Sequence, residues 1–568
     1  MTRKRWLVGS YETIVGCTIT AMLACSSGSG SSAGRSNDHG GSGPSSDVCA
    51  VAEAGDVRIS PSSGTFKDSI AVELSTATTD AEIRYTTDGR PPTASSSLYT
   101  GALSLTATTR LRAQAFLDGA ASGTETAGLF VARSIDATHD LPVIVLDSYG
   151  SGKLPTEATK RVDVDVAFLA YALNGNAASL ADTPTTTSFA AFHVRGQSSA
   201  MFPKVPYRLE LRTTSGDDRD CPMFGMASES DWALVGPYSD KTLIHNAFVY
   251  ALGREMGLKA PELRFVELYV SLANRPLATE DYQGVYQIVE IIKNQKDRLD
   301  LKQLDESVTS LPDITGGYIF KFEWRAAEEP LLPCPSGATN CWKDLEIVDP
   351  TPINSAQADY LSQHLGSFND ALHGASPVDE ATGYPSYIDV QSFVDHVIVN
   401  EFTRNMDAYA RSQYFYKDRD TKIYAGPLWD FDLIAGVGIT PGGFMGSNFA
   451  NTAAEGWQYE SNASRLAGAT SDWFPVLIAQ PAFRARLVTR WKQLRAAELS
   501  DSGISTRVDN AAKGLTSAAE RNFRKWNILS QQTVNPFSTP TEPTWAGQLQ
   551  YMKTWLVKRA AWLDSQWI

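Results

Sequence analysis

The feature that most constrains the fold of this 568-residue chain is a change in hydrophobic periodicity along it. The first half carries short strand-like patterns, such as the continuous apolar run over 141–146 and the alternation over 207–211. Helical spacing dominates later, over 241–256, 389–404, 481–499 and 548–567. Because a chain of this length exceeds one compact core, we predict an α+β protein of two or more domains.

Residues 1–25 predict an export signal. Positions 3–5 are basic, and the short apolar stretch 14–24 ends directly before Cys25. A small residue before a cysteine, with Ser and Gly after it, resembles a bacterial lipoprotein signal in which Cys25 carries the lipid. The alternative is an ordinary secretory signal cleaved nearby. We therefore expect an exported protein of the cell envelope, anchored to the membrane by this lipid alone, or else a secreted one.

The segment after the signal predicts a linker over 26–56. Residues 26–48 contain 15 Ser or Gly among 23, a composition that buries too little apolar surface to fold. The apolar runs of the sequence fall short of the roughly 18 to 20 residues that span a bilayer.

The net charge of −14 argues against a nucleic-acid partner, because such a field repels phosphate backbones. It does not exclude ATP, since a few fixed cations and a divalent metal hold triphosphate locally inside an acidic protein.

Four cysteines follow the predicted signal, at positions 49, 221, 334 and 341. In an exported protein an even number permits two disulfides. Cys334 and Cys341 bracket a loop of Pro, Ser and Gly, which favours a local bond between them. No Cys/His spacing indicates a zinc site.

Residues 57–132 predict a small all-β sandwich of short alternating strands separated by turns. The run Ile83-Arg84-Tyr85-Thr86-Thr87-Asp88-Gly89, followed by Pro92 and Leu98-Tyr99-Thr100, resembles the immunoglobulin-like domain at the C-terminus of chitobiases. The segment lacks a cluster of acids, His or Cys suited to catalysis. A spacer role is therefore favoured over carbohydrate binding.

Two motifs in the larger remaining region, 141–568, suit phosphate chemistry weakly. Arg195 to Ser199, followed by Lys204, would form a turn that exposes backbone N–H groups between two cations. A solvated hairpin is the plainer alternative. Glu290 ends an apolar strand pattern and would pair with a nearby cation, or lie on an exposed strand end.

A third motif is sharper. Asp407 follows a helical pattern, and Asp430-Phe431-Asp432 follows after room for two strands. This is the layout of phosphoryl-transfer sites, in which one Asp orients the acceptor hydroxyl and others hold Mg²⁺ on the phosphates. A calcium site or a structural acid cluster is the alternative.

Together these motifs resemble the CotH kinase family over about 141–491. The matching runs are Arg195-Gly196-Gln197-Ser198-Ser199 with Pro203-Lys204, 234–242, 284–290, Asn405-Met406-Asp407 and 426–432. The resemblance implies an atypical protein-kinase-like fold with a β-rich N-terminal lobe and a helical C-terminal lobe. It also implies ATP with Mg²⁺ or Mn²⁺, and phosphorylation of Ser or Thr on secreted or surface proteins.

The resemblance implies a role for each matching residue. Asp407 would orient the acceptor hydroxyl, Asp430 would hold the metal, and Asp432 would be a second ligand. The nucleotide-binding residues would be Arg195, Ser198, Lys204 and Glu290, with Lys204 at the phosphates and Glu290 contacting the nucleotide or orienting Lys204.

Two positions depart from the family pattern. Ser412 lies in the stretch where kinases usually place a metal-binding Asn, and His245 precedes Asn246 where many relatives carry Arg. The second function hypothesis is therefore a weak or inactive kinase fold used as a surface adhesion or structural protein. A carbohydrate-active protein is a third and weaker one, because no pair of carboxylates at a suitable spacing is identifiable.

Overall fold

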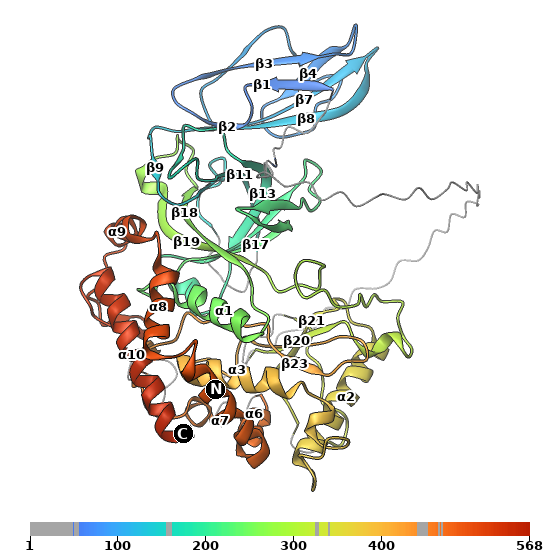
Figure 1. Cartoon of the computed structure of the whole chain (residues 1–568). Coiled ribbons are helices and arrows are strands. Elements are labelled where there is room, and N and C mark those ends of the chain that lie inside the picture. Colours follow the sequence, from blue (N-terminus) through green and yellow to red (C-terminus); the bar gives the residue numbers. More distant parts are fainter. Residues whose placement is uncertain are drawn as a thin grey trace, which may run out of the picture. The chain divides into compact units, whose positions relative to one another are not determined.

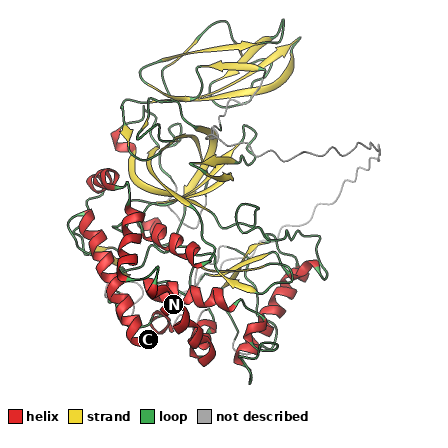
Figure 2. Ribbon diagram, viewed as in Figure 1, coloured by secondary structure: helices red, strands yellow, loops and turns green. Residues whose placement is uncertain are grey.

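A computed structural model describes residue 49 and residues 56–154, 162–323, 329–338, 341–439, 452–463, 466 and 470–568. The predicted signal, Cys25 and nearly all of the predicted linker lie outside the described residues. The chain is a mixed α+β protein, as predicted, with strands concentrated in the first half and helices in the second (Figure 2). In the part of the chain that the structure describes, no helix is long and apolar enough to cross a membrane.

The first structural region consists of two packed sheets, with strand orders β1-β3-β6 and β2-β8-β7-β4-β5. Their strands are β1 (Val57–Ser60), β2 (Gly64–Phe66), β3 (Ile70–Thr76), β4 (Glu82–Thr86), β5 (Ser97–Leu98), β6 (Leu103–Leu105), β7 (Thr109–Leu117) and β8 (Ala120–Ala132). Alternate residues of β1 are buried and exposed, so one face of each sheet supplies the shared core of Val72, Leu111 and Phe130. The two sheets therefore form a sandwich.

The second region is a closed barrel with the strand order β10-β11-β13-β14-β17-β19-β18. Its strands are β10 (Val143–Asp147), β11 (Val164–Tyr171), β13 (Thr186–Val194), β14 (Tyr207–Arg212), β17 (Asp231–Val235), β18 (Leu263–Ser271) and β19 (Tyr282–Glu290). Neighbours are antiparallel except β10 and β18, which close the barrel in parallel. Phe168, Trp232 and Tyr286 belong to the core shared by these strands. The closure leaves no exposed sheet edge and gives the following helices a rigid base.

The remaining region joins a four-stranded sheet, β21-β20-β22-β23, to a group of helices (Figure 1). The strands are β20 (Tyr318–Phe322), β21 (Leu345–Asp349), β22 (Gln413–Lys417) and β23 (Ile423–Ala425). The helices are α1 (His245–Met256), α2 (Ser355–His373), α3 (Val390–Thr403), α4 (Gln458–Ser461), α6 (Trp473–Ala479), α7 (Pro481–Ala496), α8 (Asp501–Ala512), α9 (Thr516–Lys525) and α10 (Trp545–Trp567). One large apolar core holds them together, with Phe402, Trp473 and Trp491 at its centre.

Two disulfides cross-link the described residues. Cys334 is bonded to Cys341, the local pair that the loop between them favours, and Cys49 is bonded to Cys221. Cys221 opens β15 (Cys221–Met223), a short strand that pairs with β16 (Met226–Glu229) and contributes to the barrel core. Backbone hydrogen bonds to Thr185 and Thr187 also hold Cys49 at 3.2 and 2.9 Å.

The two disulfides should differ in their contribution to stability because they close loops of very different length. The bonded residues are 172 positions apart for Cys49–Cys221 and 7 apart for Cys334–Cys341. Loop-closure entropy in the unfolded chain then predicts that replacing both cysteines by alanine lowers the free energy of unfolding by about 5 kcal/mol for Cys49–Cys221 and by about 2 kcal/mol for Cys334–Cys341. Urea unfolding of the two double variants measures this, and an equal loss in both would contradict the prediction.

Candidate active site

A cavity of about 560 Å³ brings together side chains from the barrel, the four-stranded sheet and the segments after α3 and β23. The hairpin between β13 and β14 contributes Arg195 to Ser199, including the start of a single 3₁₀ turn, Ser199–Met201. The other charged and hydroxyl residues of its lining are Asp163, Arg208, Glu210, Asp231, Lys293, Lys321, Glu323, Glu329, Asp407, Arg411, Ser412, Tyr414, Asp430 and Asp432. The cavity therefore combines carboxylates with several cations.

Five of the seven predicted catalytic, nucleotide and metal residues line this cavity. They are Arg195, Ser198, Asp407, Asp430 and Asp432. The guanidinium of Arg195 lies over the Trp429 ring, 5.2 Å from its centroid, so the barrel hairpin and the segment before Asp430 touch across the cavity. Lys204 and Glu290 do not line it.

Lys204 is instead fully buried against helix α9. Its Nζ donates to Asn522 Oδ1 at 2.8 Å and to the Pro237 carbonyl at 3.2 Å, and lies 5.1 Å from the centroid of the Tyr286 ring. Burial holds the pKa of Lys204 well below its usual range. Lys204 thus lies outside the lining of the cavity that holds the three acids, and its contact with phosphates stays a prediction.

Glu290 pairs with a cation, but the cation is Arg298 rather than Lys204. Its Oε2 also accepts the backbone N–H of Glu262 at 2.8 Å. Glu290 lines a second cavity of about 280 Å³ together with Lys293, Arg298 and Pro427. The structure thus places this acid at a strand end beside the first cavity, with no contact to Lys204.

The carboxyl groups of Asp430 and Asp432 lie next to each other in the cavity lining, where Asp430 is exposed and Asp432 is half-buried. Desolvation by the surrounding protein raises the pKa of both groups, and the charge of Asp407 raises both further. The charge of Asp430 adds to the rise at Asp432, whereas the hydrogen bond between the two carboxyl groups lowers the pKa of Asp430. Asp430 has a left-handed backbone conformation, with φ of 63°. Ser412, at the position where an Asn is expected, places its Oγ 3.4 Å from Asp430 Oδ2.

The loop that carries Asp407 is held against the segment that follows Asp432. Met406 N–H donates to the Leu433 carbonyl at 3.1 Å, and Ala435 N–H donates to the Thr403 carbonyl at 3.0 Å. Asp407 N–H donates to Asn405 Oδ1 at 3.2 Å. These bonds hold the loop of Asp407 beside the segment that carries Asp430 and Asp432, and all three acids line the cavity.

A buried ion pair fixes the C-terminal end of α3, which directly precedes this loop. Arg559 on α10 lies 3.2 Å from Glu401, and neither side chain is exposed. Arg559 also donates to the Glu401 carbonyl at 2.7 Å and to the Gly456 carbonyl at 2.6 Å. Burial lowers the pKa of Arg559 to about 10, which still leaves the guanidinium charged at neutral pH.

Replacing Arg559 with Leu should destabilise the protein by about 3 to 5 kcal/mol, because Glu401 would remain buried without its cation. The matched control is Lys558→Leu on the exposed side of the same helix, which should change stability by less than about 0.5 kcal/mol. The free energy of unfolding in urea measures both, and equal losses would contradict this role of the pair.

Sequence reasoning missed several cavity residues, among them Lys321, Glu323 and Arg411. Lys321 Nζ lies 3.4 Å from both Glu323 and Glu346, and Arg411 Nε lies 3.5 Å from Glu323. The available signal was a lysine inside the apolar run Tyr318–Phe322, since a charge in a buried strand needs partners. Burial raises the pKa of Glu323 from its usual value of 4.5 to about 7.

The raised pKa of Glu323 predicts a pH-dependent stability. The folded protein keeps this proton up to about pH 7 while the unfolded chain releases it near 4.5. The contribution of Glu323 to the free energy of unfolding therefore falls as pH rises from about 4.5 to 7. Glu323→Gln should become more stable relative to the parent protein over this window, by no more than about 3 kcal/mol. Stability curves that stay parallel from pH 4.5 to 7.5 would refute this.

The donor set suits a divalent cation only in part. Among the described residues, no three or more His, Cys, Asp or Glu side chains form a group that could hold a metal by themselves. Asp430 and Asp432 do supply neighbouring carboxylates, and Mg²⁺ is commonly held by one or two carboxylates together with waters and substrate phosphates. Two neighbouring acids whose charges repel are the groups that such a cation would stabilise.

Comparison with known families gives two matches. A family model described as CotH kinase protein matches residues 192–563, about two thirds of the chain. A model described as chitobiase/beta-hexosaminidase C-terminal domain matches residues 61–127. Both families, and their order, are those that the sequence motifs indicate. Comparison with curated proteins finds no match.

Proposed function

The chain belongs to the CotH kinase protein family, and from this premise we propose that it is a kinase that transfers the γ-phosphate of ATP to Ser or Thr of secreted or surface proteins. The observation that supports this best is the convergence of Asp407, Asp430 and Asp432 on one cavity. In this proposal the barrel is the N-terminal lobe of an atypical kinase-like fold, and the helical region is the C-terminal lobe.

Each acid has a defined part in the proposed transfer. Asp407 orients the acceptor hydroxyl and receives its proton as the oxygen bonds to the γ-phosphorus. The bond between that phosphorus and the β,γ-bridging oxygen breaks, and ADP leaves. Asp430 and Asp432 would hold Mg²⁺ or Mn²⁺, which when bound supplies positive charge to the phosphate oxygens.

The cations of the cavity would bind the phosphates in place of Lys204. Arg195, Lys321 and Arg411 all line the cavity with the three acids. Arg195 comes from the barrel, and the other two come from β20 and the loop before β22. Cations on both sides of the cavity would bring together the parts of the protein that must close on a nucleotide.

The alternative is a weak or inactive kinase fold that serves as a surface adhesion or structural protein. Ser412 favours it, because a hydroxyl replaces the amide expected to hold a second metal. The contact of Ser412 with Asp430 supports instead a site adapted to fewer metal ligands.

The proposed setting is outside the cytoplasm. The N-terminal sequence supports export with a lipid on Cys25 as the membrane anchor, and secretion is the alternative. The partners would be protein substrates rather than nucleic acid, and the sandwich would act as a spacer rather than as a carbohydrate-binding module.

The test is incorporation of labelled γ-phosphate into the purified chain and candidate acceptor proteins with Mg²⁺ or Mn²⁺. Asp407→Asn should lower the rate by about 100-fold or more while ATP binding stays nearly intact. Asp430→Asn should weaken metal-dependent ATP binding. The control is Asp509→Asn, because Asp509 is a surface acid paired with Lys553. This variant should leave the transfer rate and ATP binding unchanged.

Equal residual activity in the two cavity variants would overturn these roles. Absence of both incorporation and ATP binding in the parent protein, measured by calorimetry, would favour the adhesion or structural alternative.

A further inference from the structure

Helix α1 contacts the backbone of three consecutive residues, Asp430 to Asp432. Asp430 N–H donates to the Tyr250 hydroxyl at 3.1 Å, and Phe431 N–H donates to Asn246 Oδ1 at 2.8 Å. His245 Nδ1 lies 2.9 Å from the Asp432 carbonyl oxygen and donates to it. One helix therefore satisfies two successive amides and the next carbonyl of the turn that carries both proposed metal ligands.

The turn needs such support for two reasons. Asp430 has φ of 63°, a left-handed conformation that costs free energy in a residue with a Cβ. The carboxyl groups of Asp430 and Asp432 also lie next to each other, where like charges repel. Both effects favour opening of the turn, and the bonds from α1 oppose it.

The helix residues that make these bonds are themselves fixed. Gln287 on barrel strand β19 contacts them: its Oε1 is 3.4 Å from Asn246 Nδ2, and its Nε2 donates to the Leu243 carbonyl at 2.8 Å. Asp240 accepts the backbone N–H groups of Thr242, Leu243 and His245 at 2.8 to 3.1 Å. Hydrogen bonds therefore hold the start of α1 to the barrel.

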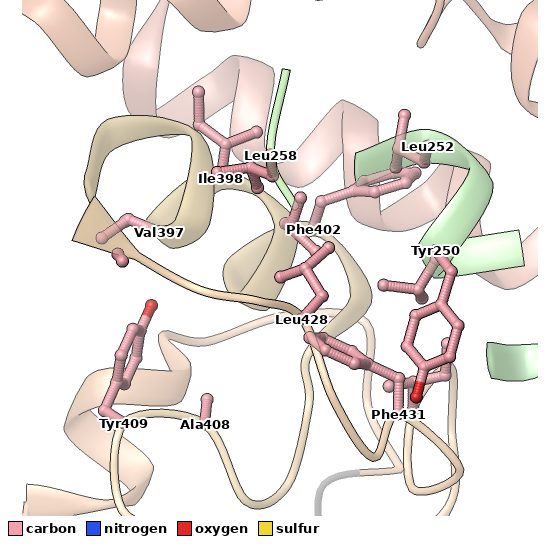
Figure 3. Packing of buried hydrophobic residues seen from close by; sticks show 14 of the residues in the cluster. Tyr250, Leu252, Leu258, Val397, Ile398, Phe402, Ala408, Tyr409, Leu428 and Phe431 are labelled. Carbon is pink, nitrogen blue, oxygen red and sulfur yellow. The ribbon is translucent and has the colours of Figure 1, made fainter. Parts of the chain in front are cut away.

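Apolar packing extends the same contact. Figure 3 shows Leu428 and Phe431 in the core near Tyr250 and Phe402, which come from α1 and α3. A Cβ atom built at Gly253 of α1 would lie 2.2 Å from Leu428 Cδ1, so the helix and this segment approach as closely as a glycine allows. Leu428 N–H donates to the Lys259 carbonyl at 2.9 Å, just beyond the helix.

We infer that Asn246 and Tyr250 are positioning residues of the proposed kinase, which hold the Asp430 and Asp432 carboxylates ready for metal by fixing the backbone between them. This inference rests on the proposed function for the role of those carboxylates. It also makes α1 the element through which the barrel sets the geometry of the metal-binding turn, because a shift of this helix displaces both acids together.

The decisive variant is Tyr250→Phe, which removes one hydroxyl and leaves the ring in place. The matched control is Tyr318→Phe, which removes another buried hydroxyl, bonded to the Ile314 carbonyl at 2.9 Å and absent from the cavity lining. Loss of one such bond should raise the Mg²⁺ concentration for half-maximal phosphate transfer by roughly fivefold, with most of the rate recovered at saturating Mg²⁺. The control should keep the parent value.

Amide hydrogen exchange tests the same inference without any assay of activity. The amides of Asp430 and Phe431 should exchange slowly in the parent protein and faster in Tyr250→Phe and Asn246→Ala, while Tyr318→Phe leaves them protected. Unchanged exchange in both α1 variants would overturn the inference, whatever the protein's activity.

The kinetic result distinguishes failure of the positioning role from failure of the proposed kinase function. An active parent protein whose Tyr250→Phe variant has an unaltered Mg²⁺ dependence would refute the positioning role alone. A parent protein that neither binds ATP nor transfers phosphate would refute the proposed function, and the exchange data would still decide whether α1 holds the turn.

Discussion

The arrangement of the candidate site depends on one buried carboxylate, Glu401. It accepts hydrogen bonds from the Tyr409 hydroxyl, the backbone N–H groups of Gln458 and Tyr459, and the guanidinium of Arg559. Burial raises the pKa of this carboxyl group, and these four donors oppose that rise by stabilising the charged form. Segments more than 150 residues apart therefore meet at a single side chain, six residues before Asp407.

Local sequence was sufficient for much of the fold. The alternation in β1 and β14 predicts their buried faces, and the helical spacing after residue 389 predicts α3 almost to the residue. The start of α1 was predicted four residues early, because Asp240 accepts the N–H groups of Thr242 and Leu243 and holds that segment as a turn. A side chain competing for backbone N–H groups is difficult to infer from apolar spacing alone.

Site residues were predictable where they belong to a continuous sequence motif. They were not predictable where contacts with residues distant in sequence determine the position of the side chain. Asp407, Asp430 and Asp432 share a cavity as their motifs imply, whereas Lys204 turns away because Asn522, 318 residues later, supplies its hydrogen-bond acceptor. Glu290 likewise forms an ion pair with Arg298 instead of contacting Lys204. Lys321 lies within an apolar strand, and only the pairing of that strand with β21 shows that Glu346 lies beside it.

The bond between Cys49 and Cys221 determines how mechanical load enters the protein. Cys49 precedes every strand of the sandwich, whereas Cys221 belongs to a hairpin that contributes to the barrel core. A pull on the chain ahead of Cys49 therefore reaches the barrel through one covalent cross-link. The sandwich lies in the loop that this cross-link closes and carries none of the tension. In an oxidising environment the intact bond therefore shields the folded sandwich from a force applied between the chain ahead of Cys49 and the barrel.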